Sequence, residues 1–196
     1  MAAPFTIGIE EEFQLVDRQT GQLSPGIQSI LERGHAIFGE QIKAEMLQPT
    51  VELISDILPD IVTARKEMQV LRGRLARLAQ EEGLALVSAG THPTALWQDQ
   101  LRSPHERYAQ LEDELQDVAR SILIFGQHIH IGVENQEAAV ILMNPVANVA
   151  STFAGPFLQL TFLGRASDRP QILSFRCVEA LPAQRGTGSF PLLERF

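Results

Sequence analysis

The chain has little of what several common protein classes depend on. Its 196 residues include one cysteine, Cys177, which excludes an intrachain disulfide and a zinc site built from several cysteines. No stretch reaches the ~18 uninterrupted apolar residues of a membrane span, and the first residues lack the basic and apolar segments of an export signal. The sequence therefore predicts a cytoplasmic protein that does not interact with membranes.

Positive charge and phosphate-binding loops are also scarce. There are 16 Lys and Arg residues against 24 Asp and Glu, and no basic stripe forms, which argues against a nucleic-acid partner. Neither a G-x-x-x-x-G-K-[ST] loop nor a G-x-G-x-x-G fingerprint occurs. If the protein uses ATP, we expect metal ions to bridge the phosphates to a sheet. With 44% hydrophobic residues, the chain can bury a sizeable core.

The most informative stretch is a predicted strand over residues 6–16. Side chains alternate between the two faces of a strand, so Glu10 and Glu12 share one face while Ile9 and Phe13 share the other. Two carboxylates on one face repel each other unless a cation lies over them. A hard divalent ion such as Mg²⁺ is the natural candidate. The alternative is a solvated edge strand whose acidic face discourages aggregation.

A second strand, predicted over residues 46–54, carries another carboxylate. Glu52 lies on its polar face, opposite the apolar Val51 and Leu53. Pro49 indicates an edge position or a bulge. One bulged residue would bring Glu45 to the same face as Glu52, because a bulge shifts the alternation by one.

A later strand, predicted over residues 124–133, carries imidazoles in place of carboxylates. His128 and His130 share one face, and Ile129 and Ile131 share the other. Two imidazoles at this spacing can bind a metal or a phosphate, and the alternative is a pair of ordinary core or surface histidines.

Helices are expected to separate these strands. Residues 60–82 have the clearest 3.6-residue apolar period, and a helix after Ser24 and Pro25 should end near Gly39. The other predicted elements are a strand over 84–91, a helix over 106–123 and a helix from 134 that Pro145 interrupts. Because each polar strand keeps one apolar face, the pattern predicts one sheet with helices on one side and a polar site on the other.

Four of these segments together resemble a known family. Their order and spacing are similar to those of the carboxylate-amine ligases related to glutamate-cysteine ligase type 2, in the glutamine-synthetase-like superfamily. The four segments are residues 8–13 (GIEEEF), 45–55, 89–93 (AGTHP) and 126–132 (GQHIHIG), within a match over roughly 6–144.

The resemblance implies an α+β fold with a largely antiparallel sheet whose polar face holds Mg²⁺ and ATP. It also implies that glutamate, or a similar carboxylate, is converted to an acyl phosphate, which an amine such as cysteine captures as an amide. Glu10, Glu12 and Glu52 match the metal carboxylates of the family, and Glu45 matches a nearby acidic position. His128 matches the histidine of the metal and nucleotide site, and His130 lies beside it as a further nucleotide-binding candidate.

Family members are considerably longer, which predicts an incomplete glutamine-synthetase-like catalytic domain. Residues 1–144 would be its N-terminal part and 145–196 a divergent segment, without the strands and the Arg and Lys side chains expected after His-x-His. Such a truncated or frame-disrupted member would expose a sheet edge and associate into homo-oligomers. One alternative is a non-catalytic remnant that binds Mg²⁺ or nucleotide. Another is a metal-dependent hydrolase using His128 and His130, although barrels of that kind typically need ~250 residues.

Overall fold

Seven strands in one sheet and two long helices make up the part of the chain that the computed structural model describes. This part comprises residues 5–104, 108, 123–135, 137–143 and 145, and the backbone of 158–163 and 171–178. The strands are β1 (Ile7–Asp17), β2 (Ile42–Ala44), β3 (Thr50–Ile54), β4 (Leu84–Val87), β5 (Gly126–Val133), β6 (Leu158–Leu163) and β7 (Gln171–Val178). The helices are α1 (Ile27–Phe38) and α2 (Ile61–Glu81), with short 3-10 turns η1 (Gly39–Gln41) and η2 (Trp97–Asp99).

Strand β1 is the centre of the sheet, whose order is β2-β3-β1-β5-β7-β6 with β4 also paired to β1. All of these pairings are antiparallel, which confirms the predicted sheet. Residues 10–14 of β1 pair with β3 along one edge. Along the other edge, 7–11 pair with β5 and 14–17 with β4. This second edge therefore has a break between β5 and β4, which we call the strand gap.

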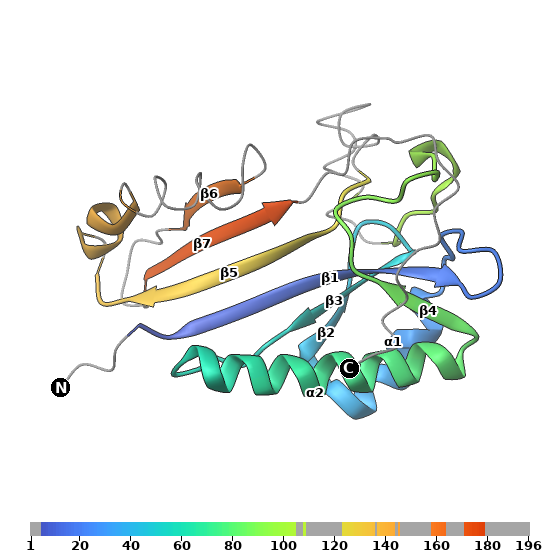
Figure 1. Cartoon of the computed structure of the whole chain (residues 1–196), viewed down its shortest axis with the longest axis horizontal. Coiled ribbons are helices and arrows are strands. Elements are labelled where there is room, and N and C mark those ends of the chain that lie inside the picture. The colour runs from blue at the N-terminus through green and yellow to red at the C-terminus, as the bar shows by residue number, and fades with distance from the viewer. Residues whose placement is uncertain are drawn as a thin grey trace.

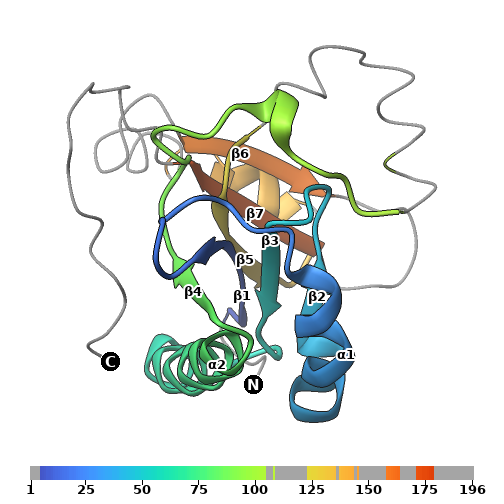
Figure 2. The same cartoon turned by 90° about the vertical axis from the view of Figure 1, so that its right-hand side faces the viewer.

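Both helices cover the same face of the sheet (Figures 1 and 2). Helix α2 begins after Asp60, whose side chain accepts a hydrogen bond from the Thr63 amide at 2.8 Å. The helix ends at Glu81, and Gly83 follows with a positive φ of 76°. Its buried stripe repeats at spacings of three and four and consists of Ala64, Met68, Leu71, Leu75 and Leu78. The prediction for residues 60–82 is thus confirmed.

The hydrophobic core lies between these helices and the β2, β3, β1 and β4 part of the sheet. Ile9, Phe13, Val51 and Leu53 are buried there, as predicted. Ile129 and Ile131 are only half-buried, although both were expected to be buried. The physical reason is position: α1 packs on β2 and α2 on β1 and β4, whereas β5 lies beyond this covered region.

Several predicted boundaries are corrected. The strand expected over 46–54 is shorter, because only β3 lies in this range and the residues before it, including Pro49, connect it to β2 in a hairpin. Helix α1 starts after Gly26, and no side chain caps its first turn. The Ser24 amide instead donates a hydrogen bond to the Leu15 carbonyl oxygen, and Pro25 lies before the helix. Strand β4 already ends at Val87.

Other corrections concern the later part of the chain. Strands β6 and β7 extend the sheet beyond β5, so the expectation that strands after His-x-His are missing was wrong. Residues 137–143 are helical, as expected, and Pro145 also has helical backbone. The helix predicted over 106–123 falls almost wholly outside the described residues. Among the described helices, none combines the length and apolar character needed to cross a membrane.

Candidate metal centre

The polar face of the sheet is organised by the register of β1 with its two neighbours. Glu12 is the Cα partner of Glu52 in β3, and Glu10 is the Cα partner of His128 in β5. Because paired residues in an antiparallel ladder share a face, this register places the two β1 carboxylates on one face, as the alternation predicted. His130 joins the same face one step further along, opposite Gly8.

Glu12, Glu45 and Glu52 form one group, which we call the carboxylate cluster. One carboxylate oxygen from each residue lies within 4.8 Å of the other two. Glu12 Oε2 also accepts a hydrogen bond from the Gly126 amide at 2.7 Å, which fixes this side chain against the start of β5. Three carboxylates this close together form the oxygen-rich arrangement that hard divalent cations prefer.

Glu45 reaches the cluster by a different route from the predicted bulge. It directly follows β2, in which Lys43 is the Cα partner of Glu52. Glu45 lies two residues beyond Lys43, so the ordinary alternation of β2 carries it to the polar face. The hairpin between β2 and β3 therefore brings Glu45 and Glu52 together without any irregularity in either strand.

The electrostatics of the carboxylate cluster are unfavourable to full ionisation. The pKa of Glu52 is raised from 4.5 to about 8, first by burial and then by the negative charges of Glu45, Glu10 and Glu12. Glu52 is only 7% exposed, so water does little to screen this repulsion. The protein alone thus leaves negative charge that a bound cation would compensate.

Glu10, His128 and His130 form a second group, the imidazole cluster. His128 Nδ1 lies 2.6 Å from Glu10 Oε2, and His130 Nε2 lies 3.3 Å from Glu10 Oε1 without the geometry of a hydrogen bond. The two rings meet nearly edge to face, with centroids 6.1 Å apart. The hydrogen bond to His128, and then the nearby imidazole of His130, hold the pKa of the Glu10 carboxyl well below its usual range. This cluster offers one oxygen and two nitrogen donors to a metal or a phosphate.

The structure thus brings all six predicted residues to one face, in two neighbouring clusters. Their roles as ligands of a metal or nucleotide stay predictions, since the geometry alone identifies no ligand. Sequence reasoning passed over the residue between the two β1 carboxylates. Glu11 points to the helix face, where it is buried and accepts hydrogen bonds from two nitrogens of Arg72 and from Gln127.

The AGTHP segment has a structural role at the end of the sheet. His92 is buried, and its Nε2 lies 2.9 Å from the Gly21 carbonyl oxygen while Nδ1 accepts from the Ala95 amide at 3.0 Å. An accepting Nδ1 requires the proton on Nε2, which therefore donates to Gly21. His92 ties the loop after β4 to the turn after β1.

Comparison with known proteins identifies the family of the chain. The model of glutamate-cysteine ligase family 2 matches residues 6–187, most of the chain. The chain belongs to this family. A relative from Roseiflexus castenholzii, named "Putative glutamate--cysteine ligase 2", is 48% identical over 141 residues, which are 72% of this chain and 37% of the relative. Relatives of the same name include one from Herpetosiphon aurantiacus (45% identical, 72% and 37% covered) and one from Sorangium cellulosum (42% identical, 83% and 44% covered).

These figures confirm the resemblance seen in the sequence. This chain spans less than half the length of these curated relatives. The family match also extends beyond residue 144, while the proposed division of the chain at that residue stays a prediction.

A solved structure supports the fold. Glutamate-cysteine ligase from Francisella tularensis, in complex with AMP, matches with a TM-score of 0.51 over 76% of this chain and 30% of that protein. At 16% identity, this likeness shows that the sheet and helices share an architecture with that ligase.

Proposed function

We propose that this chain contributes the Mg²⁺ and ATP site of a carboxylate-amine ligase of the glutamate-cysteine ligase type. The observation that carries the proposal is the convergence of the carboxylate and imidazole clusters on the polar face of one sheet. Membership of the family supplies the reaction class. The cytoplasm as its location belongs to the same proposal.

The donors of the two clusters fit Mg²⁺. Glu12, Glu45 and Glu52 would hold the ion through oxygen, and Glu10 with His128 would complete the site on the imidazole side. The raised pKa of Glu52 supports this assignment, because mutual repulsion of the carboxylates is what a bound cation relieves. Bound Mg²⁺ would neutralise charge on the triphosphate and on the group being transferred.

The proposed reaction has two steps. An oxygen of the substrate carboxylate, which we take to be that of glutamate, attacks the γ-phosphorus of ATP, and the bond to ADP breaks to leave an acyl phosphate. The amine nitrogen then attacks the acyl carbon, a C–N bond forms, the C–O bond to phosphate breaks and the nitrogen loses a proton. The protein mainly positions these groups. Glu10 holds both imidazoles in place, and His130 would contact the nucleotide phosphates.

Thermal unfolding with and without Mg²⁺-ATP tests the proposal. A ligand that binds only the folded state raises the midpoint by mass action, so the wild-type midpoint should rise. Glu12→Gln should reduce this rise strongly, and His128→Ala should reduce it less, since Mg²⁺ prefers oxygen to nitrogen ligands. Glu40→Gln, at an exposed acid outside both clusters, is the matched control and should respond like wild type. Ionic strength is held constant so that screening is not mistaken for binding.

Two outcomes would change the interpretation. If the wild-type chain is folded and its thermal unfolding midpoint does not change with Mg²⁺-ATP, the proposed site is refuted. A midpoint shift without phosphate release from ATP, in the presence of glutamate and an amine, would favour a binding remnant over a catalyst.

A further inference from the structure

Gln127 belongs to the last pair of the ladder between β1 and β5, at the edge of the strand gap. Its Cα partner is Glu11, and its side-chain Nε2 donates a hydrogen bond to Glu11 Oε1. A carboxylate only accepts hydrogen bonds, so the amide of Gln127 presents its nitrogen to Glu11. Glu11 also accepts from two nitrogens of Arg72 in α2, one of them Nε at 2.6 Å. One buried carboxylate therefore joins β1, β5 and α2 on the helix face of the sheet.

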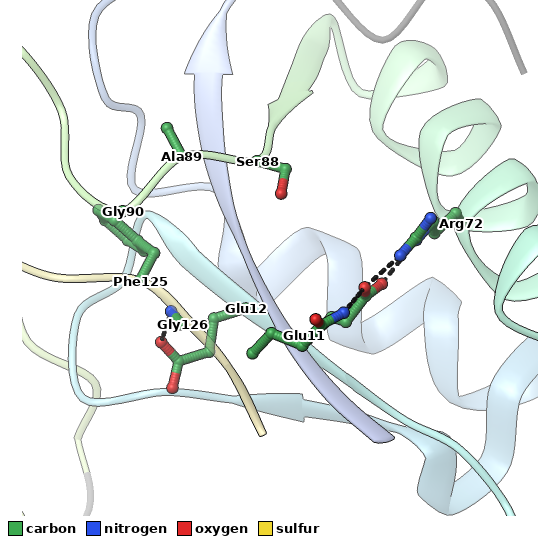
Figure 3. A pocket seen from close by; sticks show the side chains of 9 residues that line it. Glu11, Glu12, Arg72, Ser88, Ala89, Gly90, Phe125 and Gly126 are labelled. Atoms are coloured by element: carbon green, nitrogen blue, oxygen red, sulfur yellow. Dashed lines mark hydrogen bonds and ion pairs between the residues drawn. The ribbon is translucent and has the colours of Figure 1, made fainter. Parts of the chain in front are cut away.

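The strand gap leaves this pair without a neighbouring pair on one side. A pocket of about 220 Å³ lies in the gap, and Glu11 and Gln127 both line it. Figure 3 shows this pocket, with Arg72 and Glu11 on one side of β1 and with Glu12 and Gly126 on the other. Strand ends open more easily than strand interiors because fewer contacts hold them. The side-chain hydrogen bond from Gln127 to Glu11 supplies a contact that a continued ladder would otherwise provide.

The residues before and after Gln127 hold two acids of the candidate metal centre. The Gly126 amide donates to Glu12 Oε2 at 2.7 Å, and His128 Nδ1 lies 2.6 Å from Glu10 Oε2. Both contacts lie on the polar face, whereas the Gln127 side chain turns to the helix face. Because these three residues of β5 are consecutive in one backbone, a shift at Gln127 changes both polar-face contacts at once.

We propose that Gln127 is a positioning residue for the candidate metal centre. Its hydrogen bond to Glu11 fixes the start of β5 against β1 from the face opposite the metal site. The benefit to metal binding rests on the proposed function, whereas the effect on the position of β5 does not. If Gln127 only satisfied the buried Glu11 carboxylate, its loss would lower stability and leave the polar face unchanged.

Gln127→Met tests the proposal, because methionine has a similar length and no hydrogen-bond donor. Gln41→Met is the matched control, since Gln41 Nε2 donates to Glu67 Oε1 at 3.1 Å outside both clusters. Hydrogen exchange of the Gly126 amide is followed by NMR in metal-free protein, and Mn²⁺ binding is followed by electron paramagnetic resonance without nucleotide. Gln127→Met should speed this exchange and weaken Mn²⁺ binding by about tenfold each, as expected for the loss of one hydrogen bond to a charged group. Gln41→Met should change neither.

A pair of further variants keeps the test decisive if Gln127→Met does not fold. Gln127→Glu alone places two carboxylates together and should weaken Mn²⁺ binding. Adding Glu11→Gln restores one donor and one acceptor with their roles exchanged, and should return Mn²⁺ binding and Gly126 exchange to wild-type values.

The proposal is wrong if Gln127→Met behaves like Gln41→Met in both measurements, whatever its effect on the free energy of unfolding. It is equally wrong if the double variant binds Mn²⁺ and protects Gly126 no better than Gln127→Glu alone. A wild-type chain that binds no Mn²⁺ would count against the proposed function instead, and faster Gly126 exchange in Gln127→Met would still support the role of Gln127 in placing β5.

Discussion

Metal-free protein should lose stability as the pH rises from about 5 to 8, because the Glu52 carboxyl is harder to ionise in the folded state. Its pKa is about 8 when folded, against 4.5 as the ordinary value. Between these two values the folded chain retains a proton that the unfolded chain has released. The stabilisation is therefore complete below pH 4.5 and is lost as the pH rises through the folded pKa.

The size of the effect follows from the same two pKa values. Each pKa unit corresponds to about 1.4 kcal/mol, so a shift from 4.5 to about 8 sets an upper bound of about 5 kcal/mol. Relaxation and hydration of the carboxylate cluster on ionisation reduce this bound, and we expect about 2 kcal/mol. Glu10 does not contribute in this window. Its pKa is lowered, so its stabilisation is present above pH 4.5 and is lost only at lower pH.

Urea unfolding between pH 5 and 8, with a chelator present, measures this loss. Glu52→Gln should flatten the dependence on pH, whereas the exposed-site control Glu40→Gln should keep it. Saturating Mg²⁺ in place of the chelator should also flatten the wild-type curve, since the ion stabilises the ionised carboxylates. If Glu52→Gln and wild type lose the same free energy of unfolding between pH 5 and 8, the electrostatic account of the cluster is wrong.

Three further predictions concern the rest of the fold. Arg72→Met should lower the free energy of unfolding in urea by about 3–5 kcal/mol, because it leaves Glu11 buried without its cation. Adding Glu11→Gln should restore part of this loss, and an equal loss with and without Glu11→Gln would contradict the prediction. Leu75→Ala should cost about 2–5 kcal/mol yet leave the Mg²⁺-ATP midpoint shift unchanged, since Leu75 is buried in the helix-facing core. Sedimentation should detect oligomers because β2 ends the strand order with an open edge, and a compact monomer would count against this.

The sequence predicted the polar face well because alternation is a local property. In β1, every second residue faces the site, so the positions of Glu10 and Glu12 required no knowledge of the rest of the fold. The same rule placed His128 and His130. What remained was whether these strands are neighbours, and the resemblance to the ligase family supplied that.

The sequence pattern gave a wrong prediction where two backbone arrangements produce the same pattern of residues. A bulged strand and a hairpin both bring Glu45 to the side of Glu52, and Pro49 fits either one. Strands β6 and β7 were missed although Leu158–Leu163 alternates apolar and polar residues over most of its length. Their flanks are rich in Gly, Pro and Ser, which masks a short strand in a window of ordinary length.

The run Glu10, Glu11 and Glu12 links the site to the core. Three consecutive acids on a strand alternate faces, so the outer two meet the imidazole and carboxylate clusters while Glu11 turns to the helices. The sequence held a signal for its partner: Arg72 lies four residues after Met68, within the apolar stripe of α2, where an unpaired cation would be costly. One acid among the helix-facing positions 7–15 of β1 and one base within the facing stripe imply a buried pair. That pair fixes α2 against the strand that carries both site carboxylates, so a change in Arg72 should disturb the site without touching it.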